Sequence, residues 1–165
     1  MKIKKAINSL EALIKDPSRG LPEDIFLFIS KITPMINVDL LIKNKGDHTL
    51  LTWRDDGYCP PGWHIPGGIV RYKESTSDRI KAVAAGELGV CIRFKNHPLA
   101  INEVMHPSRA IRGHFISFLY KCTLIGRPNK KLRYEKGNPK PGEWTWHSKC
   151  PNNLISVHEI YRNFI

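Results

Sequence analysis

The sequence lacks the patterns of a metal ribbon, a disulfide scaffold or a membrane span. Its four cysteines include no CxxC pair, which argues against a zinc ribbon or a dense disulfide framework and favours reduced thiols. No apolar run approaches the ~18 residues of a spanning helix. Charged Glu11 and Lys15 interrupt the apolar stretch near the start, where a secretory signal needs an unbroken one. These absences predict a cytoplasmic protein with no membrane partner.

Acidic residues are scarce relative to basic ones. The 15 Asp and Glu stand against 26 Lys and Arg, which gives a formal net charge of +11 and a pI near 9.7. This excess biases association toward nucleic acid, anionic membranes or phosphorylated small molecules, and it does not choose among them. The remaining composition, 41% hydrophobic and 25% charged over 165 residues, is that of one globular domain.

Hydrophobic periodicity predicts an alternation of helices and strands. The predicted helices are 2–15, 25–32, 74–88 and 152–164, and the predicted strands are 35–43, 49–54, 90–94, 99–105, 114–124 and 144–147. Turn residues at 44–47 predict that the first two strands form a hairpin. Segments 55–68 and 126–142 are rich in Gly and Pro, so we expect irregular loops there. Strands on both sides of an internal helix imply an α/β domain at 21–165, with a mixed sheet covered on both faces, after a helical extension at 1–20.

One segment carries a recognisable motif. Residues 66–90 read PGGIVRYKESTSDRIKAVAAGELGV, which resembles the Nudix box G-x5-E-x7-R-E-U-x-E-E-x-G-U, where U is a bulky aliphatic residue. The matching positions are Gly68, Glu74, Glu87, Gly89 and Val90, and the preceding run Trp63-His64-Ile65-Pro66-Gly67 resembles the lead-in common in this superfamily. The resemblance implies a Nudix-type α/β/α sandwich with a mixed sheet.

The box is reduced at four positions. Its arginine, the following glutamate, the aliphatic position and the first of the paired glutamates are replaced by Ala82, Val83, Ala84 and Gly86. Carboxylates at i, i+3 and i+4 of a helix project from one face and bind Mg²⁺ together, and here that face offers only Glu87. A single carboxylate still holds Mg²⁺, or Mn²⁺, if backbone carbonyls of Gly67 or Gly68, substrate phosphate and water complete the octahedron. We expect Glu74 to stabilise the start of the helix instead.

The reduced box is similar to that of the GDP-mannose mannosyl hydrolases, which also lack the middle glutamates. Asp39 lies on what resembles the first strand of that family, Arg54 ends a strand that is similar to one facing the diphosphate, and Glu87 falls on the metal-binding glutamate. His158 lies in a C-terminal helix similar to theirs. Because burying Asp39 in an apolar strand is costly without a partner, we expect it to meet either Arg54 or a ligand.

That similarity implies an activity. It implies hydrolysis of a nucleoside-diphosphate sugar such as GDP-mannose, in which water attacks the anomeric carbon and the nucleoside diphosphate leaves, and it implies a homodimer. When carbon is attacked, the metal need only stabilise the departing diphosphate while positive side chains assist. The carboxylates that activate water beside phosphorus then become dispensable.

The late loop leaves two further hypotheses open. The Gln-His pair that the mannosyl hydrolases carry there, metal ligand and catalytic base, is replaced by Lys140-Pro141 in a register on Trp146. Glu143 resembles the late-loop glutamate that many Nudix pyrophosphatases use as a base or second metal ligand, so a pyrophosphatase using Glu87 with Glu143 is the second hypothesis. A non-catalytic nucleotide- or RNA-binding module is the third. The sequence has no RGG tract and no aromatic–basic alternation that would favour nucleic acid.

A few other residues are candidates for the site. Tyr58 can stack on a nucleobase, and Arg109 with Arg112 can grip a phosphate. His106 follows a predicted strand near the position of a functional histidine in the family, which makes it a catalytic candidate. For each of these residues the alternative is an ordinary surface or structural role.

Overall fold

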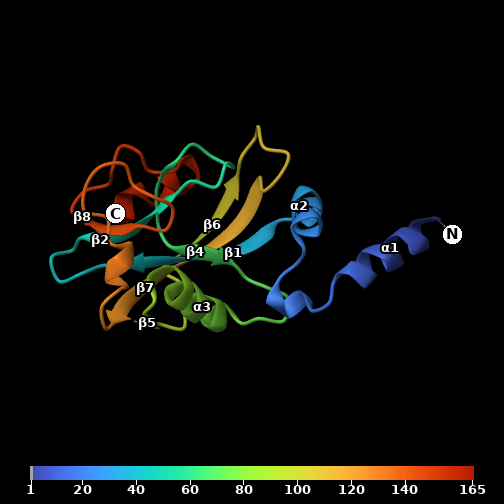
Figure 1. Cartoon of the computed structure of the whole chain (residues 1–165), viewed down its shortest axis with the longest axis horizontal. Coiled ribbons are helices and arrows are strands. Elements are labelled where there is room, and N and C mark those ends of the chain that lie inside the picture. Colours follow the sequence, from blue (N-terminus) through green and yellow to red (C-terminus); the bar gives the residue numbers. More distant parts are fainter. Residues whose placement is uncertain (1) are drawn as a thin grey trace.

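Two β-sheets form the body of the molecule (Figure 1). The computed structural model describes residues 2–165. The larger sheet has the order β4-β1-β7-β5, with β6 also paired to β7, and consists of β1 Met35–Ile42, β4 Gly67–Ile69, β5 Cys91–Phe94, β6 Ala100–Met105 and β7 His114–Ile125. The smaller sheet has the order β3-β2-β8 and consists of β2 Thr49–Arg54, β3 Gly62–His64 and β8 Trp144–His147.

Strand β1 organises the larger sheet. It pairs in parallel with β7 and antiparallel with β4, so the predicted mixed sheet is confirmed. Its sequence, MINVDLLI, is rich in branched apolar residues because both of its faces are covered. Val38, Leu40 and Ile42 pack on one face and Leu41 on the other. Asp39 is the buried acid within this apolar run.

Helix α3, Thr76–Leu88, covers one face of this sheet. Its first turn is capped by the Ser75 hydroxyl, which accepts a hydrogen bond from the Asp78 backbone N–H at 3.0 Å, and it ends at Gly89, whose φ of 63° is the left-handed C-cap conformation. Its buried residues are Arg79, Ile80, Val83, Ala84 and Leu88. The predicted helix is therefore confirmed with a start two residues later, and its last turn carries Glu87.

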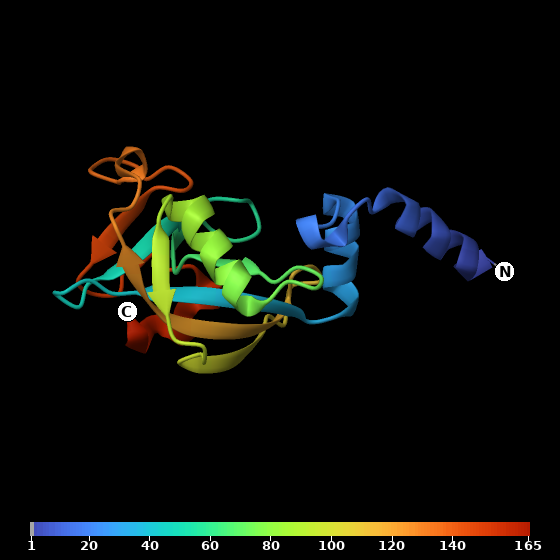
Figure 2. The same ribbon diagram turned by 90° about the horizontal axis from the view of Figure 1, so that it is seen from below.

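The opposite face is covered near the C-terminus. The 3-10 segment η3, Ser156–Phe164, lies on the other side of the larger sheet from α3 (Figure 2). Its Tyr161 packs in a second apolar cluster with Leu41, Trp63 and Leu119. The predicted closing helix thus exists as 3-10 helix. It places His158 and Tyr161 beside β1.

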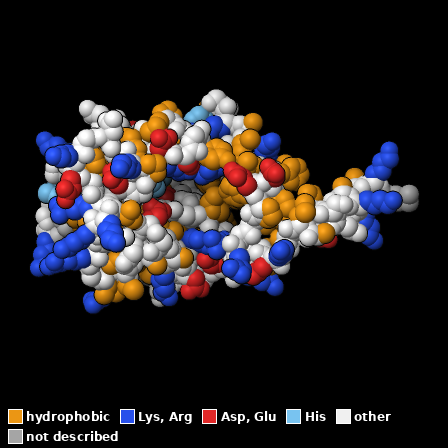
Figure 3. All heavy atoms as spheres, in the orientation of Figure 1, with side chains coloured by type: hydrophobic (Ala, Val, Ile, Leu, Met, Phe, Trp, Pro, Cys, Tyr) orange, Lys and Arg blue, Asp and Glu red, His pale blue; other side chains and the backbone are white. Residues whose placement is uncertain are grey.

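Two helices precede the body of the molecule. Helix α1, Lys2–Leu13, projects away from the two sheets (Figures 1 and 3). It buries no residue, so Ile3 and Leu13 remain exposed. Helix α2, Glu23–Ile32, lies close to the body and buries Ile25 and Ser30. The predicted N-terminal helical extension is confirmed. No helix in the described part of the chain is long and apolar enough to cross a membrane.

Two local predictions were wrong. The first two strands do not form a hairpin: they belong to different sheets and meet through a single bridge between Lys43 and Thr49, because β2 takes β8 as its partner. Segment 55–68 is not wholly irregular, since β3 and the start of β4 lie within it. The late segment 126–142 is a loop as predicted, apart from one 3-10 turn, η2 Lys130–Leu132.

Candidate active site

A cavity of about 450 Å³ opens where β1, β2, β4, the end of α3 and η3 come together. Seven of the nine predicted site residues line it: Asp39, Arg54, Tyr58, Gly67, Gly68, Glu87 and Arg109. These residues are far apart in the sequence and reach the cavity from six different strands, helices or loops. The fold therefore brings most of the predicted site together.

His106 and Glu143 do not line the cavity. His106 lies in the turn after β6, where its Nδ1 is 3.2 Å from the Ser108 hydroxyl. Glu143 accepts a hydrogen bond from the Lys140 backbone N–H at 2.9 Å, so its carboxylate closes its own turn. Its backbone carbonyl meanwhile accepts from the Trp53 N–H at 2.7 Å and fixes that turn to β2.

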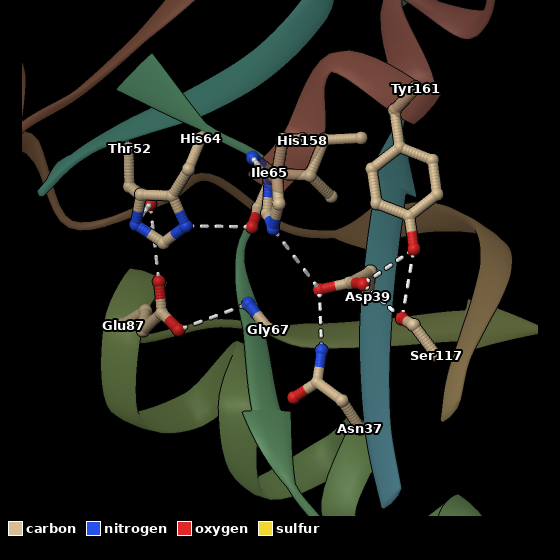
Figure 4. Close-up of polar contacts among 10 residues, drawn as sticks. All are labelled: Asn37, Asp39, Thr52, His64, Ile65, Gly67, Glu87, Ser117, His158 and Tyr161. Carbon is tan, nitrogen blue, oxygen red and sulfur yellow. Dashed lines mark hydrogen bonds and ion pairs between the residues drawn. The ribbon is translucent and has the colours of Figure 1, made fainter. Parts of the chain in front are cut away.

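Glu87 reaches the cavity from the last turn of α3. Its Oε1 accepts a hydrogen bond from the Gly67 N–H, and its Oε2 lies near the Thr52 hydroxyl, each at 3.2 Å (Figure 4). Burial raises the pKa of this carboxyl to about 7, although both hydrogen bonds act in the opposite direction. Glu87 carries no ion pair among the described residues. Its negative charge is therefore poorly compensated, as expected of a carboxylate that binds a cation.

The two glycines of the box differ in what their backbones offer. In the β1–β4 ladder, Leu40 N donates to Pro66 O and Val70 N donates to Ile36 O. Bonded and non-bonded pairs alternate in an antiparallel ladder, so the backbone groups of Gly68 face β1 and those of Gly67 face the open edge of the sheet. A Cβ at Gly67 would collide with Asp39 Oδ1, which explains the need for glycine there.

Asp39 is held by neutral groups rather than by a cation. Asn37 Nδ2 donates to Oδ1 at 2.9 Å, and the hydroxyls of Tyr161, at 2.7 Å, and Ser117 donate to Oδ2 (Figure 4). Burial raises the pKa of Asp39 to about 6 against the effect of these three hydrogen bonds. Of the two partners expected for Asp39, Arg54 or a ligand, Arg54 does not pair with it. Arg54 acts on this carboxyl only at longer range.

Two histidines line the wall between these carboxyls. His158 Nδ1 accepts from the Ile65 N–H at 3.1 Å, so its proton is on Nε2, which lies 3.8 Å from Asp39 Oδ1. His64 Nδ1 lies 2.8 Å from the Ile65 carbonyl and donates to it. Burial lowers the pKa of each histidine to about 3. Both rings are therefore neutral at physiological pH.

The Thr52 hydroxyl links His64 to Glu87. Its Oγ1 lies 2.9 Å from His64 Nε2 and 3.2 Å from Glu87 Oε2, and it has one hydrogen to donate. Because His64 is neutral and donates through Nδ1, its Nε2 accepts from Thr52, and Glu87 must then carry a proton to bond with Thr52. An ionised Glu87 takes the Thr52 hydrogen instead. The protonation of Glu87 thus decides which way the hydroxyl points.

Two arginines on the wall of the cavity supply positive charge. Arg54 Nε donates to Asp56 Oδ2 at 2.8 Å, and Arg112 Nη1 lies 3.6 Å from the same oxygen. The Arg112 guanidinium also lies over the Tyr58 ring, 4.4 Å from its centroid. The aromatic face of Tyr58, which was predicted to stack on a nucleobase, therefore contacts the Arg112 guanidinium instead. The neighbouring arginines hold the pKa of Asp56 below its usual value, although its partial burial acts to raise it.

Several residues of the site were not singled out from the sequence. They are Asn37, Thr52, Asp56, Ser117 and Tyr161. Asn37 had a usable signal, because side chains two apart on a strand share a face and Asn37 therefore accompanies Asp39. Ser117 had none, since only the parallel pairing of β7 with β1 brings it to Asp39. Within residues 2–165, no group of three or more His, Cys, Asp or Glu side chains is arranged to hold a metal ion.

Comparisons with known sequences found one related protein. No family model matches the chain. The low-salt glycan biosynthesis protein Agl8 of Haloferax volcanii is 29% identical over 112 residues, which are 66% of this chain and 70% of that protein.

Solved structures resemble the chain over a larger share of its length. The MutT Nudix hydrolase of Burkholderia pseudomallei superposes with a TM-score of 0.62 at 18% identity, over 81% of this chain and 98% of that one. A possible asymmetric diadenosine tetraphosphate hydrolase of Jonesia denitrificans superposes with a TM-score of 0.60 at 16% identity, over 78% and 90% of the two chains. At these identities the likeness concerns the fold. The chain has the Nudix fold that its reduced box predicts.

Proposed function

We propose that the chain is a divalent-metal-dependent hydrolase of a nucleoside-diphosphate sugar, releasing the nucleoside diphosphate and the free sugar. The observation that carries the proposal is the charge of the cavity lining, which combines the Glu87 carboxylate with the Arg54 and Arg112 guanidiniums. A metal-bound diphosphate is complementary to it, because its cation needs a carboxylate and its oxygens need donors. The name of the Haloferax relative, a glycan biosynthesis protein, agrees with a sugar-bearing substrate.

The donor set fits one partly hydrated Mg²⁺. This ion prefers oxygen ligands, keeps several waters, and is commonly bound by one or two carboxylates together with substrate phosphates. Glu87 and the Gly67 carbonyl, which faces the open sheet edge, would hold it, and Mn²⁺ suits the same oxygen ligands. When bound, the ion neutralises charge on the diphosphate and improves it as a leaving group.

The protein's own groups bind the substrate and take up a proton. Arg54 and Arg112 donate to diphosphate oxygens. Both ring nitrogens of His64 are engaged, and the one free position of His158 is a donor. Asp39, which lines the cavity and whose pKa is raised to about 6, is left as the group that accepts the proton of the attacking water.

Attack at carbon is favoured over attack at phosphorus by what α3 offers. Of its two carboxylates only Glu87 lines the cavity, because Asp78 lies in the exposed first turn. Glu143, on which the pyrophosphatase hypothesis depends, holds the Lys140 N–H instead. A site with this few carboxylates is better suited to stabilising a leaving diphosphate than to activating water beside phosphorus.

Product analysis separates the candidates. The protein is incubated with a panel of nucleotide sugars, GDP-mannose first, in Mg²⁺ or Mn²⁺ and in ¹⁸O-water. Nucleoside diphosphate and ¹⁸O-labelled sugar support the proposal, whereas nucleoside monophosphate and sugar phosphate support the pyrophosphatase. No hydrolysis of any member contradicts both. Salt-sensitive RNA binding that survives Glu87→Gln and needs no metal would support the non-catalytic module instead.

The homodimer implied by the family resemblance stays a prediction. The chain mass is 18.9 kDa, so light scattering coupled to size exclusion distinguishes one copy from two. A mass equal to one chain at all concentrations tested would contradict the dimer.

A further inference from the structure

Two arginines from separate segments converge on one oxygen atom. Arg54 is the last residue of β2, and its Nε and Nη2 lie 2.8 and 2.5 Å from Asp56 Oδ2. Arg112 belongs to the turn before β7, and its Nη1 lies 3.6 Å from the same Oδ2. The point occupied by this oxygen is therefore a position built for an anion, on the wall of the cavity that also contains Glu87.

The Arg112 side of this position is held by α2. Ser30, which is buried in α2, accepts a hydrogen bond from the Arg112 backbone N–H at 3.2 Å. The backbone of Arg112 adopts a φ of 52°, a left-handed conformation that a non-glycine residue rarely takes without support. Its guanidinium lies over two aromatic rings, 4.4 Å from the centroid of Tyr58 and 5.9 Å from that of Phe26. Arg112 is thus held by Ser30, by the two aromatic rings and by Asp56, and only the last of these four contacts involves the carboxylate.

Asp56 is held less firmly. It belongs to a loop in which Gly57 has a φ of 76° and Pro60 and Pro61 follow. Its side chain is 32% exposed, and apart from the two arginines its contact is the Tyr58 backbone N–H at 3.2 Å, a local turn. The carboxylate can therefore leave the two arginines without disturbing the core of either sheet.

We propose that Asp56 is an internal anion, which occupies the phosphate position at Arg54 and Arg112 until a phosphate group of the ligand displaces its carboxylate. The proposal rests on the proposed function, since it assumes that a diphosphate enters this cavity. A diphosphate presents more oxygens and more negative charge to the arginines than one carboxylate does, so it can replace Asp56, whereas a singly charged anion gains little. Asp56 thereby lowers affinity for every anion and favours those with more than one charge.

Binding in the absence of divalent metal tests this role. GDP and inorganic pyrophosphate are titrated by calorimetry into the wild type, Asp56→Asn and the matched control Asp55→Asn. The control removes the same charge one residue away, from a carboxylate that pairs with neither arginine. We expect Asp56→Asn to tighten binding about tenfold, the scale of one charge-assisted hydrogen bond, and Asp55→Asn to tighten it much less. Adding Arg112→Gln to Asp56→Asn should abolish the gain.

The outcomes distinguish this inference from the function on which it rests. If the wild type binds GDP but Asp56→Asn binds it equally or more weakly, Asp56 only positions Arg54, and the internal-anion role is wrong. If neither protein binds GDP or pyrophosphate, the internal-anion role is wrong, and the titration is repeated with Mg²⁺, where absence of GDP binding would also contradict the proposed function. Circular dichroism verifies that each variant is folded. Asp56→Ser, which keeps a small polar group for the turn, replaces Asp56→Asn if that variant unfolds.

Discussion

Two groups of residues line the cavity and differ in how they hold a carboxyl group: Asp39 and Glu87, here called the inner end, and the partly exposed Asp56 with Arg54 and Arg112, here called the outer end. At the inner end, Asp39 and Glu87 are held by backbone N–H groups, hydroxyls and an amide, and burial raises the pKa of both. At the outer end, Asp56 meets two guanidiniums, which hold its pKa below its usual value. The difference lies in burial and in the partners rather than in the residue type, because Asp39 and Asp56 are the same amino acid.

This contrast indicates which ligand charge each end will accept. Ionising a buried carboxyl costs free energy, and a cation bound at the inner end would offset that cost. Adding an anion at the outer end requires that Asp56 be displaced, since its carboxylate already occupies the position that both arginines face. A metal-bound diphosphate satisfies both ends at once. The following predictions test that asymmetry, from the largest expected effect to the smallest.

Replacing the inner carboxylate should have the largest effect on turnover. We expect Glu87→Gln to lower kcat for the nucleotide sugar by roughly 1,000-fold, since a bound metal contributes several kcal/mol to charge stabilisation. The exposed Asp78→Asn on the same helix is the control and should retain wild-type rates. Steady-state kinetics at saturating Mg²⁺ provides the measurement. Turnover by Glu87→Gln within tenfold of wild type would remove Glu87 from the metal site.

The same substitution should stabilise the fold at high pH. The folded-state pKa of Glu87 is raised from 4.5 to about 7, so the folded protein holds this proton more tightly, and stability falls as the pH rises through that interval. Glu87→Gln has no carboxyl to titrate. Between pH 5 and pH 8 its free energy of unfolding should therefore rise by at most about 3 kcal/mol relative to that of the wild type. Urea unfolding at both pH values, without metal, measures the difference.

Asp56 should have the opposite effect on the pH dependence of stability in the same unfolding assay. Its pKa is lowered in the folded state, so its contribution to stability is present above its unfolded pKa of 3.8 and is lost as the pH falls through the folded value. Asp56→Asn should therefore cost up to ~1 kcal/mol at pH 7, a small value because the pair is partly exposed. Stabilisation by Asp56→Asn at pH 7 would contradict the contrast between the two ends.

The outer arginine should matter for binding more than for chemistry. We expect Arg54→Gln to weaken GDP binding roughly 10- to 100-fold, the value of one or two charge-assisted hydrogen bonds. Arg54→Lys keeps the charge but loses the fork, and should recover part of the affinity. Arg71, which does not line the cavity, offers the control Arg71→Gln. Equal affinities for Arg54→Gln and Arg71→Gln would exclude a phosphate contact at Arg54.

Much of the fold could be predicted because its signals are local. The spacing of apolar residues indicates β1 and α3, and Ser75 and Gly89 mark the ends of that helix. The hairpin prediction failed because turn chemistry at 44–47 says how the chain reverses and not which sheet receives the next strand. The partner that decides the matter, β8, lies far along the sequence. Strand β4 escaped notice because its glycines are required by close packing against Asp39 and Val83 rather than by turn geometry.

The residues of the site likewise differ in whether their sequence signals are local. Glu87 and Gly67 follow from fixed spacing in one segment, so the sequence predicts both, and the cavity contains both. Their tuning depends on hydroxyls that tertiary pairing delivers: Ser117 through β7 and Tyr161 through η3. Residue spacing within one segment could therefore not predict that these two hydroxyls lie beside Asp39. His106 and Glu143 were sound by residue type, and the turns in which they lie direct them elsewhere.

The smallest expected effect concerns the hydroxyl that joins His64 to Glu87. The Thr52 hydrogen bond lowers the pKa of Glu87, so Thr52→Val, which keeps the shape and removes the hydroxyl, should raise that pKa further. Metal then competes with a more tightly held proton. We expect Mn²⁺ affinity without nucleotide to fall roughly fivefold at pH 6.5, the value of about 1 kcal/mol for one hydrogen bond, and less at pH 8.5, where Glu87 is ionised in both proteins. Thr52→Ser restores the donor and should restore the affinity. A loss of equal size at both pH values would mean that Thr52 acts on the position of Glu87 and not on its proton.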